Sequence, residues 1–472
     1  MGRFVLRRLL IFVPTLLVIL LVAFALSEAT PGDPVEKLFQ AAGGEFYGDV
    51  TPATIDRQYA PIARRHGLDR PAFYFSLTTA AYPDTLHRYY RTAQRRTLRQ
   101  LLDRHGHWPL VEAYYRQLIR TERSSYAVPD SLARLPAVKA LRRRLDQLKS
   151  SADPEALRDL VENSPDIPQA APLEMEFDRL RQATRALTAA RPGAAAYLPA
   201  LHWHGSQNRF HRRLTGALTL DFGVSLRDGR PVGTHLREAL GWTLLLSISA
   251  LVLSFLIAVP LGVWSAARSR SDGQGLSFFL YALYSLPVFW VATLLLIFFT
   301  TPEYGMDWFY GQWPVARSDA GFWQRVGERI GFLVLPVFCL TYGRLAYIFM
   351  QVRGGMLDVL QRPYVRTARA KGLTERRVVW GHAFRNAAFP LITMAAYLFP
   401  RAVAGSVLVE YIFSVPGMGR LTLQSIQQED WPVVFGVLLL GAVLTLVGML
   451  VSDVLYYLAD PRLRTASSST AA

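Results

Sequence analysis

The segment "RPYVRTARAKGLTERRVVWGHAFRNAAFPL" (residues 362–391) lies between two apolar runs of this chain. It carries eight basic residues, counting one histidine, and a single acid, Glu375. Pro363 suits the first turn of a helix, and Gly372 suits the left-handed position just past a helix end. Thr374 can then cap a second helix that begins at Glu375. The segment therefore predicts two short helices joined by a glycine turn, and each needs a packing partner because neither is long enough to be stable alone in water.

Apolar residues make up 51% of the 472 residues and gather in runs. Each run is about 20 residues long, the length that crosses the hydrocarbon core of a bilayer as a helix. The fold class that this predicts is an all-α polytopic membrane protein with six transmembrane helices. The six runs are Leu9–Leu26, Leu240–Ala267, Leu276–Thr300, Ile330–Val352, Phe389–Ile412 and Val433–Leu458.

Positive charge on short loops predicts the orientation of these helices. The segment 353–390 carries eight Lys and Arg residues against two acids, and the N-terminus, the 268–275 loop and the C-terminal tail are also basic. With six spans, all four regions fall on one side, so we expect both termini to be cytoplasmic. The same bias accounts for the net charge of +16, and no nucleic-acid-binding motif accompanies it.

Three domains follow from this topology. Residues 1–28 form the cytoplasmic N-terminus and first transmembrane helix, residues 29–237 an external insert, and residues 238–472 the remaining five-helix domain with the loop 353–390 between helices 4 and 5. The insert is predicted to be mainly helical, because its apolar residues recur at three- and four-residue spacing. The apolar stripes are Val138, Leu141, Leu145 and Leu148; Leu157, Leu160 and Val161, after an Asp153 cap and Pro154; and Phe177, Leu180, Thr184 and Leu187.

At this point the chain resembles a known family. The stretch "YVRTARAKGL…HAFRNAAFPLIT" is similar to the cytoplasmic loop of permease subunits of binding-protein-dependent ABC importers, above all the oligopeptide, dipeptide and nickel subfamily. Other blocks resemble the family in the expected order, although about 150 residues without a counterpart separate the second from the third. These blocks are "ATPGDP" (29–34), "GLDRP" (67–71), "FGVSLRDGRPV" (222–232), "VEYIFSVPGMGRL" (409–421) and "DVLYYLADPRLR" (453–464).

The resemblance implies that the loop 363–390 is a coupling helix that fits a cleft on an ATPase subunit. Arg366, Thr367 and Ala368 occupy the Glu-Ala-Ala positions of the family signature, and Gly372 is its glycine. Arginine at the glutamate position departs from the general consensus but is ordinary for the peptide subfamily. We expect small residues to allow close packing and charged ones to contact the rim. The expected coupling residues are Tyr364, Arg366, Thr367, Ala368, Arg369, Ala370, Lys371, Gly372 and Leu373.

The chain lacks the G-x-x-x-x-G-K-[ST] phosphate loop, so it is predicted to be a transport subunit without its own ATPase site. The resemblance implies that ATP and Mg are bound by two partner ATPase subunits, with no cofactor or metal on this chain. A second homologous permease, an extracytoplasmic solute-binding protein and the lipid bilayer complete the expected partners, and no nucleic acid is expected. The expected location is the bacterial cytoplasmic (inner) membrane, with the insert periplasmic.

Two charged residues in the fifth predicted span suggest a translocation path. Arg401 falls near the middle of this span, where a charge is costly unless it faces protein or water. We expect it either to contact a carboxylate or backbone carbonyl of a peptide-like solute or to pair with an acid on a neighbouring helix or subunit. Glu410 lies near the outer end of the span, ahead of a turn at Pro416 that suits a pore mouth.

Two further hypotheses remain open beside an importer of short peptides. In the first, a transporter of the same architecture carries a nickel chelate, glutathione or another solute. A different class, a membrane-anchored sensor or adaptor, would use the insert to detect a ligand.

Overall fold

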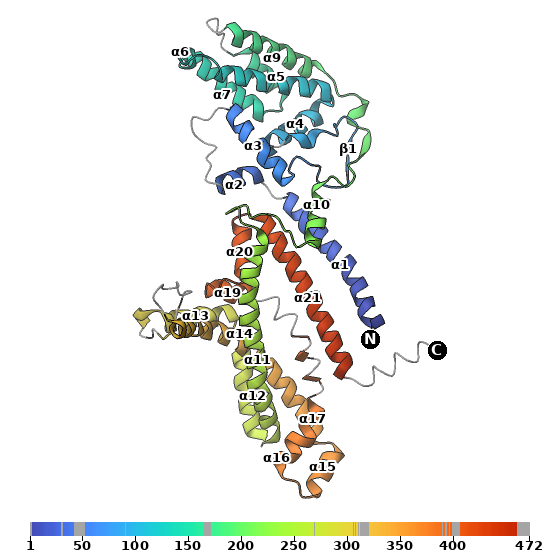
Figure 1. Ribbon diagram of the computed structural model, residues 1–472, viewed down its shortest axis with the longest axis vertical. Coiled ribbons are helices and arrows are strands. Elements are labelled where there is room, and N and C mark those ends of the chain that lie inside the picture. The colour runs from blue at the N-terminus through green and yellow to red at the C-terminus, as the bar shows by residue number, and fades with distance from the viewer. Residues whose placement is uncertain are drawn as a thin grey trace, which may run out of the picture. The chain divides into compact units, whose positions relative to one another are not determined.

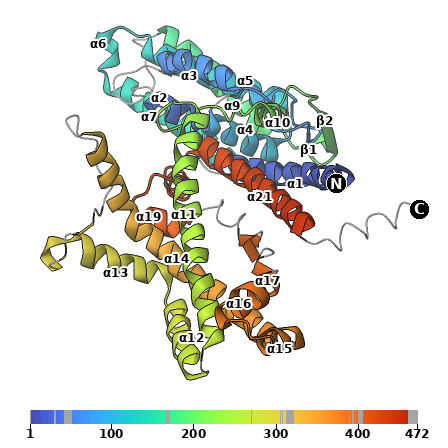
Figure 2. The same cartoon turned by 60° about the horizontal axis from the view of Figure 1, so that its bottom comes forward.

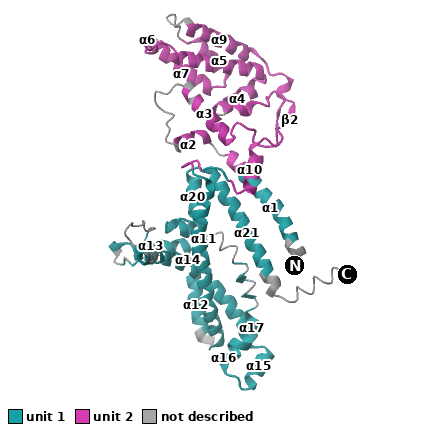
Figure 3. Ribbon diagram, in the orientation of Figure 1, with its two compact units in different colours: residues 1–23, 222–224, 230–472 teal, residues 24–221, 225–229 magenta. Residues whose placement is uncertain are grey.

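The computed structural model describes residues 2–29, 32–41, 52–89, 91–164, 171–268, 270–304, 321–388 and 406–459, together with residues 306, 308, 309, 311, 390, 391, 394, 395, 397 and 398. The chain divides into two compact units (Figure 3). The membrane unit comprises Met1–Ala23, Phe222–Val224 and Arg230–Ala472, and the insert unit comprises Phe24–Asp221 and Ser225–Gly229. Helix α1 (Gly2–Ala29) begins in the first and ends in the second.

The insert unit is mainly helical, as the periodicity predicted, and also contains a two-stranded sheet (Figure 1). Its α-helices are α2 (Pro34–Ala41), α3 (Pro52–His66), α4 (Thr92–His105), α5 (Trp108–Tyr126), α6 (Asp130–Ala133), α7 (Pro136–Ser150), α8 (Pro154–Glu162), α9 (Ala171–Ala189) and α10 (Arg209–Leu218). Its short 3-10 turns are η1 (Leu86–Arg88) and η3 (Ala194–Ala196).

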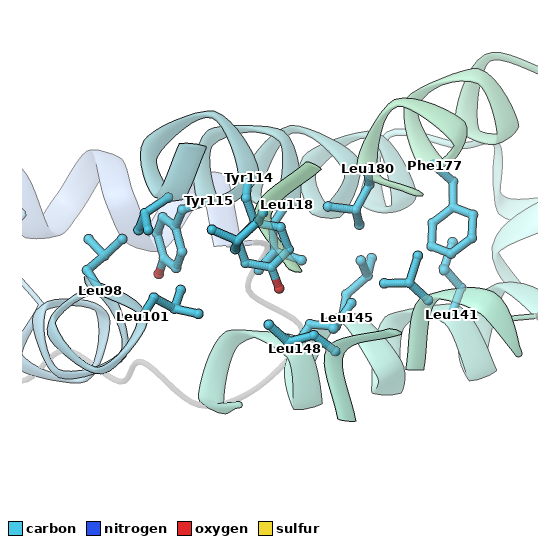
Figure 4. Close-up of a cluster of buried hydrophobic side chains, with 14 of the residues drawn as sticks. Leu98, Leu101, Tyr114, Tyr115, Leu118, Leu141, Leu145, Leu148, Phe177 and Leu180 are labelled. Carbon is cyan, nitrogen blue, oxygen red and sulfur yellow. The ribbon is translucent and has the colours of Figure 1, made fainter. Parts of the chain in front are cut away.

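The core of the insert unit is formed by α4, α5, α7, α8 and α9 (Figure 4). The predicted stripe of α7 is buried at all four positions, from Val138 to Leu148. Helix α8 begins as predicted, because Pro154 occupies its first turn and the Asp153 carboxylate accepts a hydrogen bond from the Ala156 N–H. Burial of several large side chains on each helix supplies the hydrophobic free energy that holds these helices together.

Strands β1 (Phe75–Thr79) and β2 (Pro199–Trp203) form an antiparallel pair that brings together segments far apart in the sequence. Phe75 lies opposite Trp203, and Thr79 lies opposite Pro199. The whole helical core is therefore inserted between the ends of one hairpin. No local pattern in the sequence predicts this pairing, because its register depends on residues 120 to 128 positions apart.

The membrane unit is built around two long helices, α11 (Val232–Ala267) and α14 (Phe322–Leu360), which lie side by side (Figures 1 and 2). Gly262 allows their close approach, because a Cβ there would lie 2.7 Å from the Val352 side chain. Small residues at helix crossings are typical of membrane proteins. The other elements are α12 (Arg270–Ser285), α13 (Val288–Thr300), η4 (Pro302–Tyr304), α15 (Pro363–Ala370), α16 (Glu375–Arg377), the π-helix η5 (Val378–Ala383), α17 (Phe384–Ala387), α19 (Val407–Ile412), α20 (Met418–Gln427) and α21 (Trp431–Ala459).

The predicted third span, Leu276–Thr300, is divided between two helices. Helices α12 and α13 are bent by 88° at a break between them. Pro287 causes the break, because it has no N–H to donate and restricts the backbone of Leu286. The freed Leu286 carbonyl accepts a hydrogen bond from the Tyr342 hydroxyl at 3.1 Å.

The described residues contain four helices long and apolar enough to cross a membrane, or five with the bent pair counted as one span. They are α1, α11, α14 and α21, and they correspond to the first, second, fourth and sixth predicted spans. Eleven of the 24 residues of the predicted fifth span lie outside the described residues, among them residues 399–405. The Arg8 and Asp453 side chains of α1 and α21 form an ion pair, with Nε and Oδ2 3.1 Å apart.

Candidate functional site

The loop after α14 has the predicted local structure. Pro363 stands in the first turn of α15, and Gly372 follows the helix with a φ of +76°. Thr374 is at the N-cap of α16, although its side chain makes no capping hydrogen bond. Its carbonyl instead accepts the Arg377 and Val378 N–H groups at 2.8 and 3.0 Å.

One face of this loop packs on the membrane unit's own helices. Val365 of α15 and Val378 of η5 are fully buried in a hydrophobic cluster that also contains Val352 and Met356 of α14. Figure 1 places α15, α16 and α17 together beside the end of α14. The partner that these short helices need is therefore supplied, on one face, by the same chain.

Ala368 belongs to this inward face. It is only 6% exposed and lies in the same cluster as Val365, because residues three apart share one side of a helix. Its small side chain packs against this chain's own helices, and its role in coupling stays a prediction. Leu373 also packs partly against this cluster.

The opposite face of the loop is exposed and cationic. Arg369 Nε donates to both Glu375 carboxylate oxygens at 3.1 Å, which connects α15 to α16 across the Gly372 turn. This hydrogen bonding lowers the pKa of Glu375. Arg366 and Lys371, by contrast, form no ion pair or side-chain hydrogen bond with any residue that the structure describes. Thr367, Ala370 and Gly372 are exposed beside them.

Sequence reasoning missed how the loop is closed. The Asn386 amide donates to the Tyr364 hydroxyl at 2.7 Å, so α17 is tied back to α15. Between them, residues 378–383 form one turn of π-helix, a feature often found at functional sites. The exposed Trp380 ring contacts Phe384 edge-on, 5.2 Å between centroids. No local sequence signal marks a π-helix.

Glu410 occupies a second polar site of the membrane unit. Its carboxylate is fully buried and accepts hydrogen bonds from the Gly419 and Arg420 N–H groups of α20, at 2.6 and 3.2 Å. The Thr243 hydroxyl of α11 donates to Glu410 at 2.9 Å and accepts the Met418 N–H at 2.8 Å. Two side chains thus satisfy the first three N–H groups of α20, which a helix leaves without intrahelical partners.

In this conformation Glu410 is a helix cap, and its contact with a transported solute stays a prediction. The glycines of "PGMG" permit the arrangement, because a Cβ on Gly417 would lie 2.5 Å from Glu410 Oε2 and one on Gly419 would lie 2.6 Å from Val407 Cα. Arg401, the other residue predicted for the translocation path, lies outside the described residues.

Residues 258–465 match the family model described as "Binding-protein-dependent transport system inner membrane component". The chain is 38% identical to the oligopeptide transport system permease protein AppB of Bacillus subtilis (strain 168) over 245 residues, which is 52% of this chain and 76% of that protein. It is 34% identical to the oligopeptide transport system permease protein OppB of Mycobacterium tuberculosis (strain ATCC 25618 / H37Rv) over 262 residues, which is 55% of this chain and 80% of that protein.

Proposed function

Because the chain belongs to the family of binding-protein-dependent transport system inner membrane components, we propose that the exposed face of α15 is the surface through which separate ATPase subunits drive it. The chain is a permease subunit of an ABC-type peptide importer and a multi-pass component of the inner membrane. Such a system includes a partner permease, ATPase subunits and a solute-binding protein.

The two-faced structure of the loop is the observation that supports this proposal. Val365 and Val378 bury the inner face in the same cluster as α11 and α14 side chains, so a force on the outer face moves the transmembrane helices. Among the residues that the structure describes, the side-chain donors of Arg366 and Lys371 on that outer face have no partner. Acidic groups at the mouth of an ATPase cleft would complement them.

In this mechanism ATP hydrolysis belongs to the partner subunits. Closure of the ATPases on ATP and Mg pulls α15, and the Arg369–Glu375 ion pair keeps α15 and α16 moving together across the glycine turn. The long α14 carries the displacement toward the membrane and switches the cavity between outward- and inward-facing states. Both termini and the loop lie in the cytoplasm, and the insert unit lies outside.

Site-directed crosslinking tests the proposal in the assembled transporter. The single native cysteine, Cys339, is buried, so an introduced cysteine reacts with little background. We expect Ala370→Cys on α15 to crosslink to an ATPase subunit and to do so more strongly with ATP bound. Ser131→Cys, exposed on α6 of the insert unit, is the matched control and should give no such product. Crosslinks from position 370 to lipid or to this chain alone would overturn the coupling role.

Co-purification separates the importer from a membrane-anchored sensor. An importer brings down a second permease and ATPases in fixed ratio, whereas a sensor does not. Uptake assays with short peptides, a nickel chelate and glutathione then distinguish the cargoes, and the names of the relatives favour peptides.

A further inference from the structure

A cavity of about 640 Å³ lies in the insert unit, outside the region that the family model matches. Its lining comes from the loop that precedes β1, from both strands and residue 204 after β2, from residues 82–87, from α4 and from the first residue of α10. Figure 2 labels β1, β2, α4 and α10. We call it the insert pocket. Its volume falls within the range of small-molecule binding sites.

The insert pocket is lined by more arginines than acids. Arg95 and Arg99 stand one helical turn apart on α4, and Arg70 and Arg209 face them from other segments. Arg209 forms an ion pair with Glu28, with Nη2 and Oε2 2.6 Å apart. Arg70 and Arg99, however, form no ion pair or side-chain hydrogen bond with any described residue. Two guanidinium groups of the lining therefore have donors left for a ligand.

The crowding of these cations has an energetic consequence. Burial, together with the neighbouring Arg209 and Arg99 guanidinium groups, lowers the pKa of Arg95. The neighbouring Glu28 carboxylate offsets part of this effect, and a bound anion would offset more of it. Arginine also matches a carboxylate geometrically, since its planar fork can donate two parallel hydrogen bonds.

The insert pocket also has an acidic side and an apolar wall. Asp103 accepts from the Tyr82 hydroxyl, and Asp84 lies 3.0 Å from His204 Nδ1. Each carboxylate has further lone pairs available for an ammonium group. Phe73 lines the same cavity. A ligand with a carboxylate, a cationic group and an apolar portion would match all three surfaces.

We propose that the insert pocket binds a small zwitterionic solute whose carboxylate is held by Arg99, Arg70 and Arg95. The identification of this solute as a short peptide rests on the proposed function, whereas the pocket itself is argued from the insert unit alone.

Calorimetric titration of the purified full chain in lipid nanodiscs tests the proposal. We expect trialanine to bind and its C-terminal amide to bind at least about tenfold more weakly, because the charge-assisted hydrogen bonds are lost. Arg99→Gln should weaken trialanine binding by a similar factor. Arg96→Gln is the matched control, since Arg96 is exposed on the same helix and does not line the cavity; it should bind as the parent chain does.

A further ligand distinguishes two sources of the carboxylate. Binding of Ala-Glu-Ala amide would show that a side-chain carboxylate suffices, and its failure to bind would assign recognition to the chain terminus. Equal affinity for trialanine and its amide, equal losses in the two arginine variants, or tighter binding of inorganic phosphate than of trialanine would overturn the proposal. Because binding is measured without ATPases, failure here is separate from a failure of uptake or crosslinking.

Discussion

At the scale of single residues, the membrane unit depends on a few polar contacts between elements far apart in sequence. Thr243 of α11 contacts both Glu410 of α19 and the Met418 N–H of α20. Each group is buried, and a buried polar group without a partner is costly. The contact therefore holds three helices in one arrangement.

Thr243→Val tests this contact while keeping the shape of the side chain. We expect the free energy of unfolding to fall by about 1–3 kcal/mol, because the Met418 N–H loses its acceptor and the Glu410 carboxylate loses a donor. Denaturant titration of the purified chain in micelles measures this change in the free energy of unfolding.

The control for this substitution is Thr445→Val, because among the described residues the Thr445 hydroxyl donates only to the Gly441 carbonyl of its own helix. Its effect should stay within about 0.5 kcal/mol. Equal losses of unfolding free energy in the two variants would show that the contact between Thr243 and α20 adds no stability beyond that of an ordinary threonine hydroxyl.

At the scale of elements, the coupling loop is two short helices that act as one body. Its inner face is fixed by Val365 and Val378 in the cluster with α14, and its two helices are held by the Arg369–Glu375 ion pair. The turn between them requires Gly372, whose φ of +76° is unfavourable for residues with a Cβ.

Gly372→Ala should weaken the end of α15 without disturbing the cluster. A left-handed alanine costs about 1 kcal/mol, a factor of roughly five in the local opening equilibrium. Hydrogen exchange of the amides of residues 366–371 should therefore speed up about fivefold, and uptake should fall if α15 transmits force.

Gly354→Ala supplies the contrasting substitution. Gly354 is exposed inside α14, and a Cβ there would meet nothing within 4 Å, so alanine should stabilise the helix by about 0.5–1 kcal/mol. Unchanged exchange in Gly372→Ala would contradict the strained-turn explanation.

At the scale of the whole molecule, the insert unit is a helical core placed inside a hairpin. Its principal buried cluster is drawn from residues 86–187, while β1 and β2 are paired on either side of it. The last link of the ladder is the hydrogen bond from the Ala80 N–H to the Leu198 carbonyl, at 2.8 Å. Residues 81–197, which lie between the two residues joined by this hydrogen bond, can therefore be removed as one segment.

Replacing residues 81–197 with Asn-Gly should leave a chain that still inserts into the membrane. Asn-Gly closes a tight hairpin with the twist that antiparallel strands need. We expect the membrane unit to unfold at the same denaturant concentration as in the parent chain, because none of its core residues is removed.

Deletion of residues 90–205 is the comparison, since it takes β2 away and leaves the edge of β1 without its partner. An unpaired strand edge promotes aggregation, so this variant should be recovered in lower yield by size-exclusion chromatography. Aggregation of the Asn-Gly variant to the same extent would mean that the membrane unit requires the insert core.

The sequence by itself determined the local features of this protein. Apolar runs predicted α1, α11, α14 and α21, and Pro363 and Gly372 predicted the limits of α15, because helix length and helix ends are encoded by neighbouring residues. The tertiary structure alone decided which side of α15 is buried, so that Ala368 turned inward. It likewise decided the 88° bend after α12 and the pairing of Thr243 with Glu410. These depend on groups distant in sequence that meet only after packing, and no local pattern records them.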